Sequence, residues 1–147
     1  METQKKLLRV PRPLDMITGL PAARLTHLSF IPQQFTRDAN VDDLLGNGIN
    51  FFNAGQYFEA HEAWEELWRQ TEGPLRLYYQ GLIQTAVGLH HLGTGNLNGA
   101  RAQLGKALQK LEQYPEAFCR IDNRTLIAGI QSTLHDLIPR SILILRK

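Results

Sequence analysis

The sequence predicts an all-α fold, a compact multi-helix bundle of about five helices built from antiparallel helical hairpins. Between residues 40 and 138, apolar side chains recur at spacings of three and four, which is the period of a helix with one buried face. Glycine, asparagine or proline stands at short intervals between these segments and marks tight connections. The chain has 147 residues and 43% hydrophobic content, which is enough to bury an ordinary core.

Three parts follow from composition: a Pro-rich N-terminal arm (1–39), a helical bundle domain (40–138) and a C-terminal tail (139–147). The arm contains four of the seven prolines, so regular helix is not expected there, and its apolar residues predict that it packs on the bundle. The stretch from Ser141 to Lys147 is apolar and then basic. It fits a last helical turn, a docked strand or a subunit contact.

The first helix is expected to begin at Asn40, a good N-cap residue. Gly46 and Gly48 weaken this helix and predict that another backbone approaches it closely. Gly55 should end it in the left-handed conformation. The later helices are expected from about Gly55 to Thr71, from Pro74 to Leu92, from Asn96 to before Tyr114, and from Asp122 or Asn123 to before Pro139.

A weak internal repeat has an offset of forty residues. Gly55 aligns with Gly95 and Ala60 with Ala100, and large apolar residues follow at matching positions. The pattern is similar to the second-helix half of a tetratricopeptide repeat, although two units are too few for an open solenoid. Helical hairpins that pack alike would explain it without a shared function.

One polar pair interrupts the apolar face of the second helix. His61 and Glu65 lie four residues apart at the edge of the stripe formed by Trp64 and Trp68, so they are neighbours on the helix surface. A carboxylate beside an aromatic face needs a hydrogen bond or a charged partner. The pair therefore either fixes the packing register or forms part of a metal or acid/base site.

Counting along the predicted hairpin from its turn suggests which residues of the third helix face this pair. Gln84 or Tyr79 is the expected partner of Glu65. His90 falls about one turn further away, ~5–8 Å along the axis, within reach of His61 but strained for Glu65. A divalent metal held by His61, Glu65 and His90 is the alternative.

Several motifs together resemble a known family. They are Phe52 to Glu62, Trp64 to Trp68, Tyr79 to Gln84, and the pairs Gly95-Asn96 and Gly99-Ala100. They resemble the bacterial and archaeal family called domain of unknown function 309, which is described by a His-x3-Glu-x2-Trp motif. Here that motif is His61, Glu65 and Trp68, and the resemblance covers roughly residues 43 to 112. It implies a compact all-helical bundle and no established activity.

Charge and composition exclude several classes of function. The net charge of +2 is small and evenly spread, so nucleic-acid binding is not expected. No stretch approaches the ~20 apolar residues of a membrane span. The single cysteine, Cys119, excludes an internal disulfide and fits a reducing compartment, so we expect the protein in the cytoplasm.

The function expected from these observations is that of a helical binding or scaffold module. Its site would be a polar cluster in an aromatic groove, and its partner a peptide, another protein or a second copy of the chain. The alternative is a metal-dependent or acid/base enzyme that uses His61 and Glu65. The candidate cluster residues are His61, Glu65, Trp68, Gln84 and Tyr79, and the groove is expected around Trp64, Trp68, Tyr78 and Tyr79.

Overall fold

The computed structural model describes residues 37–147, with side chains from Val41 onward. The chain divides into two units, Met1–Asn40 and Val41–Lys147, and the fold described below is that of the second. The predicted Pro-rich arm (1–39) and its packing on the bundle lie outside the described residues, except for the backbone of its last three residues.

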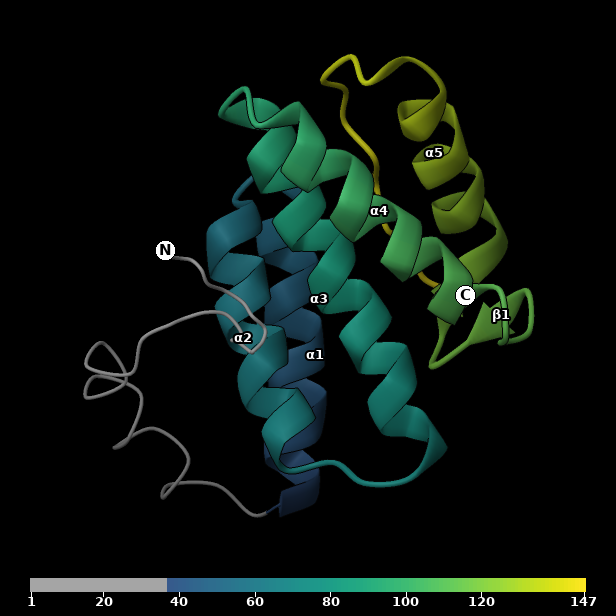
Figure 1. Cartoon of the computed structure of the whole chain (residues 1–147). Helices are drawn as coiled ribbons and strands as arrows, with labels where there is room; N and C mark the ends of the chain where they lie inside the picture. Colours follow the sequence, from purple (N-terminus) through teal and green to yellow (C-terminus); the bar gives the residue numbers. More distant parts are fainter. Residues whose placement is uncertain (1–36) are drawn as a thin grey trace. The chain divides into compact units, whose positions relative to one another are not determined.

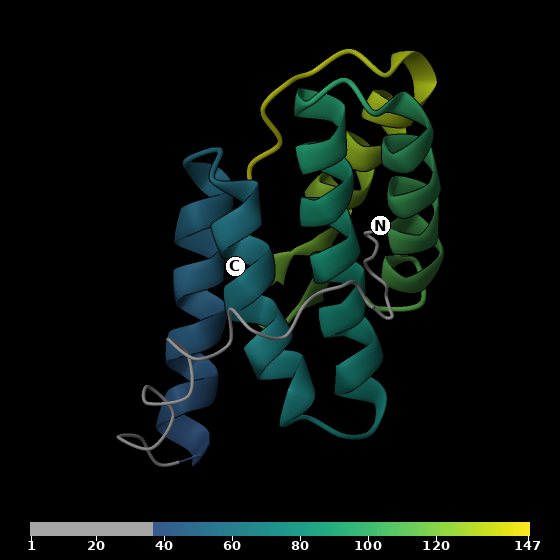
Figure 2. The same ribbon diagram turned by 60° about the vertical axis from the view of Figure 1, so that its left-hand side comes forward.

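Five helices form the described part of the chain, which confirms the predicted all-α class. They are α1 (Arg37–Asn53), α2 (Tyr57–Arg69), α3 (Pro74–Gly93), α4 (Leu97–Leu111) and α5 (Asn123–Asp136). Both Figure 1 and Figure 2 show α3 between α2 and α4, and α3 packs against both. Tight turns join these three helices, so each is antiparallel to its neighbour. None of the described helices is long and apolar enough to cross a membrane.

The first helix differs from the prediction at two places. It begins at Arg37, so Asn40 lies inside it and is not its cap. No proline or glycine stands between residues 37 and 40, so nothing interrupts the helix there. Gly48 makes room for a side chain and not for a backbone, since a Cβ at Gly48 would lie 2.1 Å from Nε1 of Trp64. A Cβ at Gly46 would meet nothing within 4 Å.

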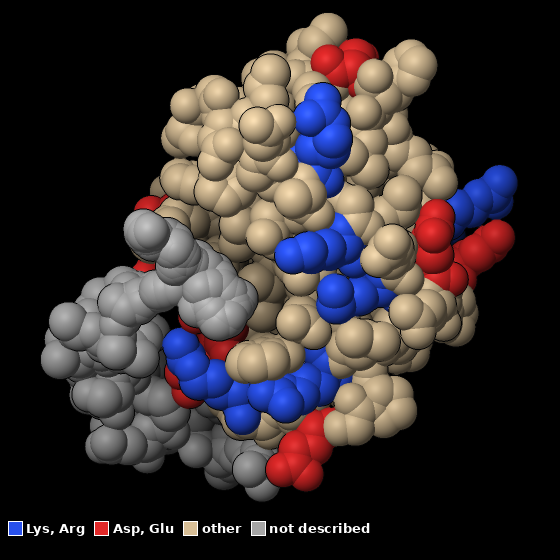
Figure 3. All heavy atoms as spheres, viewed as in Figure 1, with Lys and Arg blue, Asp and Glu red and all other residues tan. Residues whose placement is uncertain are grey.

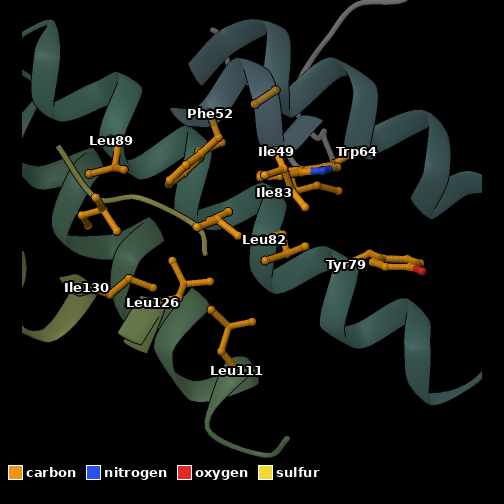
Figure 4. Packing of buried hydrophobic residues seen from close by; sticks show 14 of the residues in the cluster. Ile49, Phe52, Trp64, Tyr79, Leu82, Ile83, Leu89, Leu111, Leu126 and Ile130 are labelled. Carbon is orange, nitrogen blue, oxygen red and sulfur yellow. The ribbon is translucent and has the colours of Figure 1, made fainter. Parts of the chain in front are cut away.

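The predicted aromatic groove is closed. Trp64 and Tyr78 are 0% exposed and Tyr79 is 2% exposed, so only Trp68 of the four rings is partly exposed. Figure 4 shows Trp64 beside Ile49 and Ile83 in the core, and Tyr79 at the edge of the side chains drawn. Large aromatic rings gain most by full burial, which is why these three became core instead of lining a binding surface.

The internal repeat corresponds to two helix connections of the same shape. Gly55 and Gly95 are left-handed, with φ of 81° and 86°. In both connections the next N–H donates to the carbonyl five residues earlier, at 2.8 Å after Gly55 and 2.9 Å after Gly95. This is the Schellman arrangement that glycine favours at a helix end. Ala60 and Ala100 are both fully buried in the helices that follow.

A small β-hairpin between α4 and α5 was not predicted. Strand β1 (Ala117–Phe118) pairs with β2 (Ile121–Asp122) in an antiparallel register. The two turn residues, Cys119 and Arg120, have φ of 53° and 58°. Positive φ at both central residues is typical of a type I′ turn, which Asn-Gly signals far more often than Cys-Arg.

The C-terminal tail is docked as a strand, one of the three arrangements expected for it. Ile121 and Arg146 form a β-bridge, and the Asp122 N–H donates to the Leu145 carbonyl at 2.7 Å. On its other side, Ile144 exchanges two hydrogen bonds with the Asn53 side chain, at 2.8 Å and 3.0 Å. The tail therefore links the end of α1 to the hairpin.

Candidate functional site

The polar pair of the second helix is formed as the spacing predicts. His61 Nε2 lies 3.2 Å from Glu65 Oε2, and His61 is 8% exposed. Arg69 donates to the other oxygen of Glu65 at 3.1 Å and to Glu66 at 2.8 Å. All four residues belong to α2, so one helix positions a chain of imidazole, carboxylate and guanidinium. The carboxylate of Glu65 thus has partners on its own helix.

The hydrogen bond with Glu65 determines which nitrogen of a neutral His61 ring carries the proton. A carboxylate only accepts hydrogen bonds, so a neutral His61 carries its proton on Nε2 and leaves Nδ1 as a lone pair. Nδ1 is buried and has no hydrogen-bond partner in the described part of the chain. Gln84 Oε1 on α3 is also buried without a partner there. When the ring is neutral, both unpaired atoms are acceptors, and each lacks a donor.

His90 lies close to this pair, across one exposed aromatic ring. Phe58 is 44% exposed, and its ring centroid lies 5.7 Å from that of His61 and 5.9 Å from that of His90. Burial and then the neighbouring His61 lower the pKa of His90, so its neutral form is favoured. Among residues 41–147, no group of three or more His, Cys, Asp or Glu side chains is arranged to hold a metal ion.

His91 was not among the predicted site residues, but the structure places its ring between α3 and α4. It is half-buried, with Nδ1 3.3 Å from Nδ2 of Asn96. Burial, His90 and His61, in that order, lower its pKa to about 4. Gly99 is the signal in the sequence, because a Cβ there would lie 2.9 Å from the His91 ring. His91 is therefore neutral near pH 7.

The two predicted aromatic members of the cluster have separate roles. Trp68 is half-buried, and the Arg76 guanidinium carbon lies 3.8 Å from its ring centroid, a cation–π contact between α2 and α3. Tyr79 pairs with the Cys119 thiol, and burial and then Cys119 raise its pKa. Tyr79 therefore connects the core to the β-hairpin, whereas Trp68 contacts Arg76 near the start of α3.

A second buried polar residue lies elsewhere and is fully paired. Asn123, the first residue of α5, is 0% exposed. It accepts from the Tyr78 hydroxyl at 3.3 Å and donates to the carbonyls of Leu111 at 3.0 Å and Pro115 at 3.2 Å. This Asn123 junction ties α3, the end of α4 and α5 together. A surface pocket beside it is lined partly by Glu112, Arg124 and Gln131.

Comparison with known proteins supports the family resemblance. Residues 45–103 match the family model described as Domain of unknown function (DUF309), which confirms the resemblance read from the motifs. An uncharacterized protein of Aquifex aeolicus (strain VF5) is 28% identical over 93 residues, 63% of this chain and 28% of that protein. Uncharacterized protein YpuF of Bacillus subtilis (strain 168) is 34% identical over 92 residues, 60% of this chain and 53% of that protein. The chain thus spans about half the length of one relative and about a quarter of the other.

Proposed function

We propose that this domain is a binding module and that its site is the polar cluster formed by His61, Glu65 and Gln84 beside Trp68. The observation that carries the proposal is the pair of buried acceptors without a donor, His61 Nδ1 and Gln84 Oε1. A buried acceptor left unpaired costs about 1–3 kcal/mol. A partner that supplies N–H or O–H donors would remove this cost on binding.

The lone cysteine supports a reducing compartment, and we place the protein in the cytoplasm.

The competing interpretation is that the cluster only fixes helix packing. The bonds from His61 to Glu65 and from Glu65 to Arg69 would serve that purpose, since they satisfy a half-buried carboxylate. A packing role does not explain the unpaired oxygen of Gln84. An apolar side chain of the same shape at this position would avoid the unpaired acceptor without a loss of stability. The stability of a Gln84 variant therefore separates the two interpretations.

The test replaces Gln84 with methionine, which has a similar shape and no acceptor. If the cluster is a binding site, Gln84→Met should leave the free energy of unfolding unchanged or raise it by up to about 1 kcal/mol. Urea denaturation followed by circular dichroism gives this value, with Asn123→Leu as the paired reference. A loss above about 1 kcal/mol in Gln84→Met would show that the amide belongs to the packing network and would overturn the proposal.

A metal-dependent or acid/base enzyme is the second candidate. It is favoured by the His61 ring, whose Nε2 is bound to a carboxylate and whose Nδ1 keeps a lone pair. Histidines that ligate metals or act as bases are often oriented by a carboxylate in this way. His61 would supply a ligand atom or accept a proton at Nδ1, while Glu65 would hold the tautomer.

Metal analysis of the purified full chain tests this second candidate. A stoichiometric amount of Zn, Mn, Fe or Ni that is absent from His61→Ala would support a metal site. A substoichiometric amount of metal, or the same amount in the variant, would exclude a metal-dependent enzyme that uses His61. Circular dichroism of His61→Ala would confirm that the variant is folded.

A further inference from the structure

Three helices contribute to one surface beside the polar cluster, which we call the α2–α3–α4 face. On α3, Gln80, Gln84 and His91 fall on one stripe at helical spacing, and all three are partly exposed. Contacts place the other helices on either side of this stripe. Arg76 lies over Trp68 of α2, and a Cβ at Gly81 would lie 3.4 Å from Cβ of Lys110 on α4.

The α4 side of this face is cationic. Helix α4 carries Arg101, Lys106 and Lys110 and no acidic residue. Lys106 and Lys110 form no ion pair within the described part of the chain. Partial burial and then the charge of Lys106 lower the pKa of Lys110, so the two ammonium groups lie close enough to repel each other. Figure 3 shows Lys and Arg side chains gathered on the face that α3 and α4 present in that view.

The α2 side has the opposite character. It contributes the lone pair of His61 Nδ1, and Gln84 Oε1 lies on α3 at the middle of the face. Glu59 is close enough to raise the pKa of His90, and Glu65 lies beside His61 and is paired with Arg69, so this side carries carboxylates. One edge of the face therefore has acceptors without donors beneath it. The other edge, at most about 20 Å away across one intervening helix, is positively charged.

We propose that the α2–α3–α4 face binds an acidic peptide segment, with its carboxylates on Lys106 and Lys110 and a backbone N–H group on Oε1 of Gln84, which is buried in the free protein and turns outward on binding. This inference rests on the proposed function, because it names the ligand of the same cluster. A peptide suits both edges at once, since acidic side chains supply the charge and the main chain supplies donors. Carboxylates would also relieve the repulsion between the two lysines.

The difference in charge between the two edges of the face argues against a nucleic acid as the ligand. A polyanion gains its affinity from many phosphate contacts along a continuous basic surface. Here the two lysines lie on α4, whereas α2 carries four glutamates against a single arginine, Arg69. A strand long enough to cross the face would bring phosphates against these carboxylates. A short segment that is charged on one side avoids this repulsion.

The experiment is an NMR titration of the full-length chain with two blocked hexapeptides at about 10 mM ionic strength, where the screening length is about 30 Å. One peptide alternates glutamate and glycine, and the other has glutamine in place of each glutamate. The acidic peptide should shift the backbone N–H signals of residues 103–110 and 80–84 and saturate at about 1 mM or below. The glutamine peptide should bind at least about tenfold more weakly.

Matched variants locate the binding. The double variant Lys106→Gln and Lys110→Gln should weaken the acidic peptide at least about tenfold, and Gln84→Met should weaken it about threefold to tenfold. Arg124→Gln on α5 is the control, because its side chain is 77% exposed and lies outside this face. It should leave the affinity unchanged.

Three outcomes would overturn the inference. They are no saturable shift up to about 1 mM, equal binding of both peptides, and equal loss in Arg124→Gln and in the lysine double variant. Tighter binding of a thymidylate decamer at the same signals would also exclude an acidic peptide as the ligand. If Gln84→Met keeps full stability and the peptide does not bind, only this inference fails. If Gln84→Met is destabilised, the proposed function fails with it.

Discussion

The Asn123 junction and the His61 cluster are both polar groups inside a small helical fold, but they differ in how they are paired. Asn123 uses both its oxygen and its nitrogen, with three hydrogen bonds to α3, α4 and the loop that follows α4. The His61 cluster is half complete, because Nδ1 of His61 and Oε1 of Gln84 are buried without donors in the described chain.

This difference separates a structural role from a candidate site. A buried polar network in which every atom is paired rigidifies the fold, and this structural role is enough to explain it. A partly paired network lowers the stability of the fold, so a structural role alone does not explain it. Burial alone would not have made the distinction, since Asn123 is 0% exposed and His61 is 8% exposed. The number of unsatisfied atoms is what differs.

The largest effect is expected at the junction. Asn123→Leu should lower the free energy of unfolding by about 3–5 kcal/mol, because it leaves the Tyr78 hydroxyl and the carbonyls of Leu111 and Pro115 unpaired inside the protein. Urea denaturation measures this loss. A change below about 1 kcal/mol would mean that the junction is no better paired than the cluster, and the contrast would disappear.

Acid should destabilise the α2–α3–α4 face and leave the pairing of the junction unaffected. The pKa of His91 is about 4 in the fold and near 6.5 when unfolded, so stability is complete above about pH 6.5 and falls as the pH drops towards 4. The loss should reach about 2–3 kcal/mol, to which His90 contributes in the same direction. Urea denaturation from pH 7.5 to 4.5 should show this slope.

The variant His91→Gln serves as the control for this pH dependence. It removes the imidazole and should flatten much of the slope between pH 6.5 and 4.5. A wild-type slope that persists unchanged in His91→Gln would assign the acid sensitivity to other groups.

A smaller effect is expected at Glu65. Glu65→Gln keeps an acceptor for His61 but loses the charged pairing with Arg69, whose side chain is 37% exposed, so the loss should be about 1 kcal/mol. The ring nitrogen signals of His61 in a 15N NMR spectrum should still show the proton on Nε2. A shift of the proton to Nδ1 would show that the Glu65 charge sets the tautomer, and that the Nδ1 lone pair depends on it.

Features set by short stretches of chain could be predicted from the sequence. Apolar spacing gave four of the five helices to within about two residues, because a buried helical face must repeat with the helical period. Gly55 was expected in the left-handed conformation and has φ of 81°. The His61–Glu65 contact followed from i,i+4 geometry, which needs no tertiary structure.

Features that depend on distant parts of the chain could not be predicted in this way. The Cys119–Arg120 turn contains no glycine or asparagine, and the docked tail helps to hold it through a 2.8 Å bond from the Lys147 N–H to the Arg120 carbonyl. The expected groove closed because rings from α2 and α3 met other helices and were buried. Lys106 and Lys110 look like ordinary solvated charges in the sequence, and only the packing of α4 against α3 places Lys110 beside Gly81.

The sequence by itself determined four of the five helices closely, the glycine that ends the first helix, and a histidine and a carboxylate side by side, because each of these depends on residues at most five positions apart. Only the tertiary structure decided which polar atoms were left without partners. That outcome depends on which groups from other helices come within hydrogen-bonding distance, and packing sets those distances, not local preference.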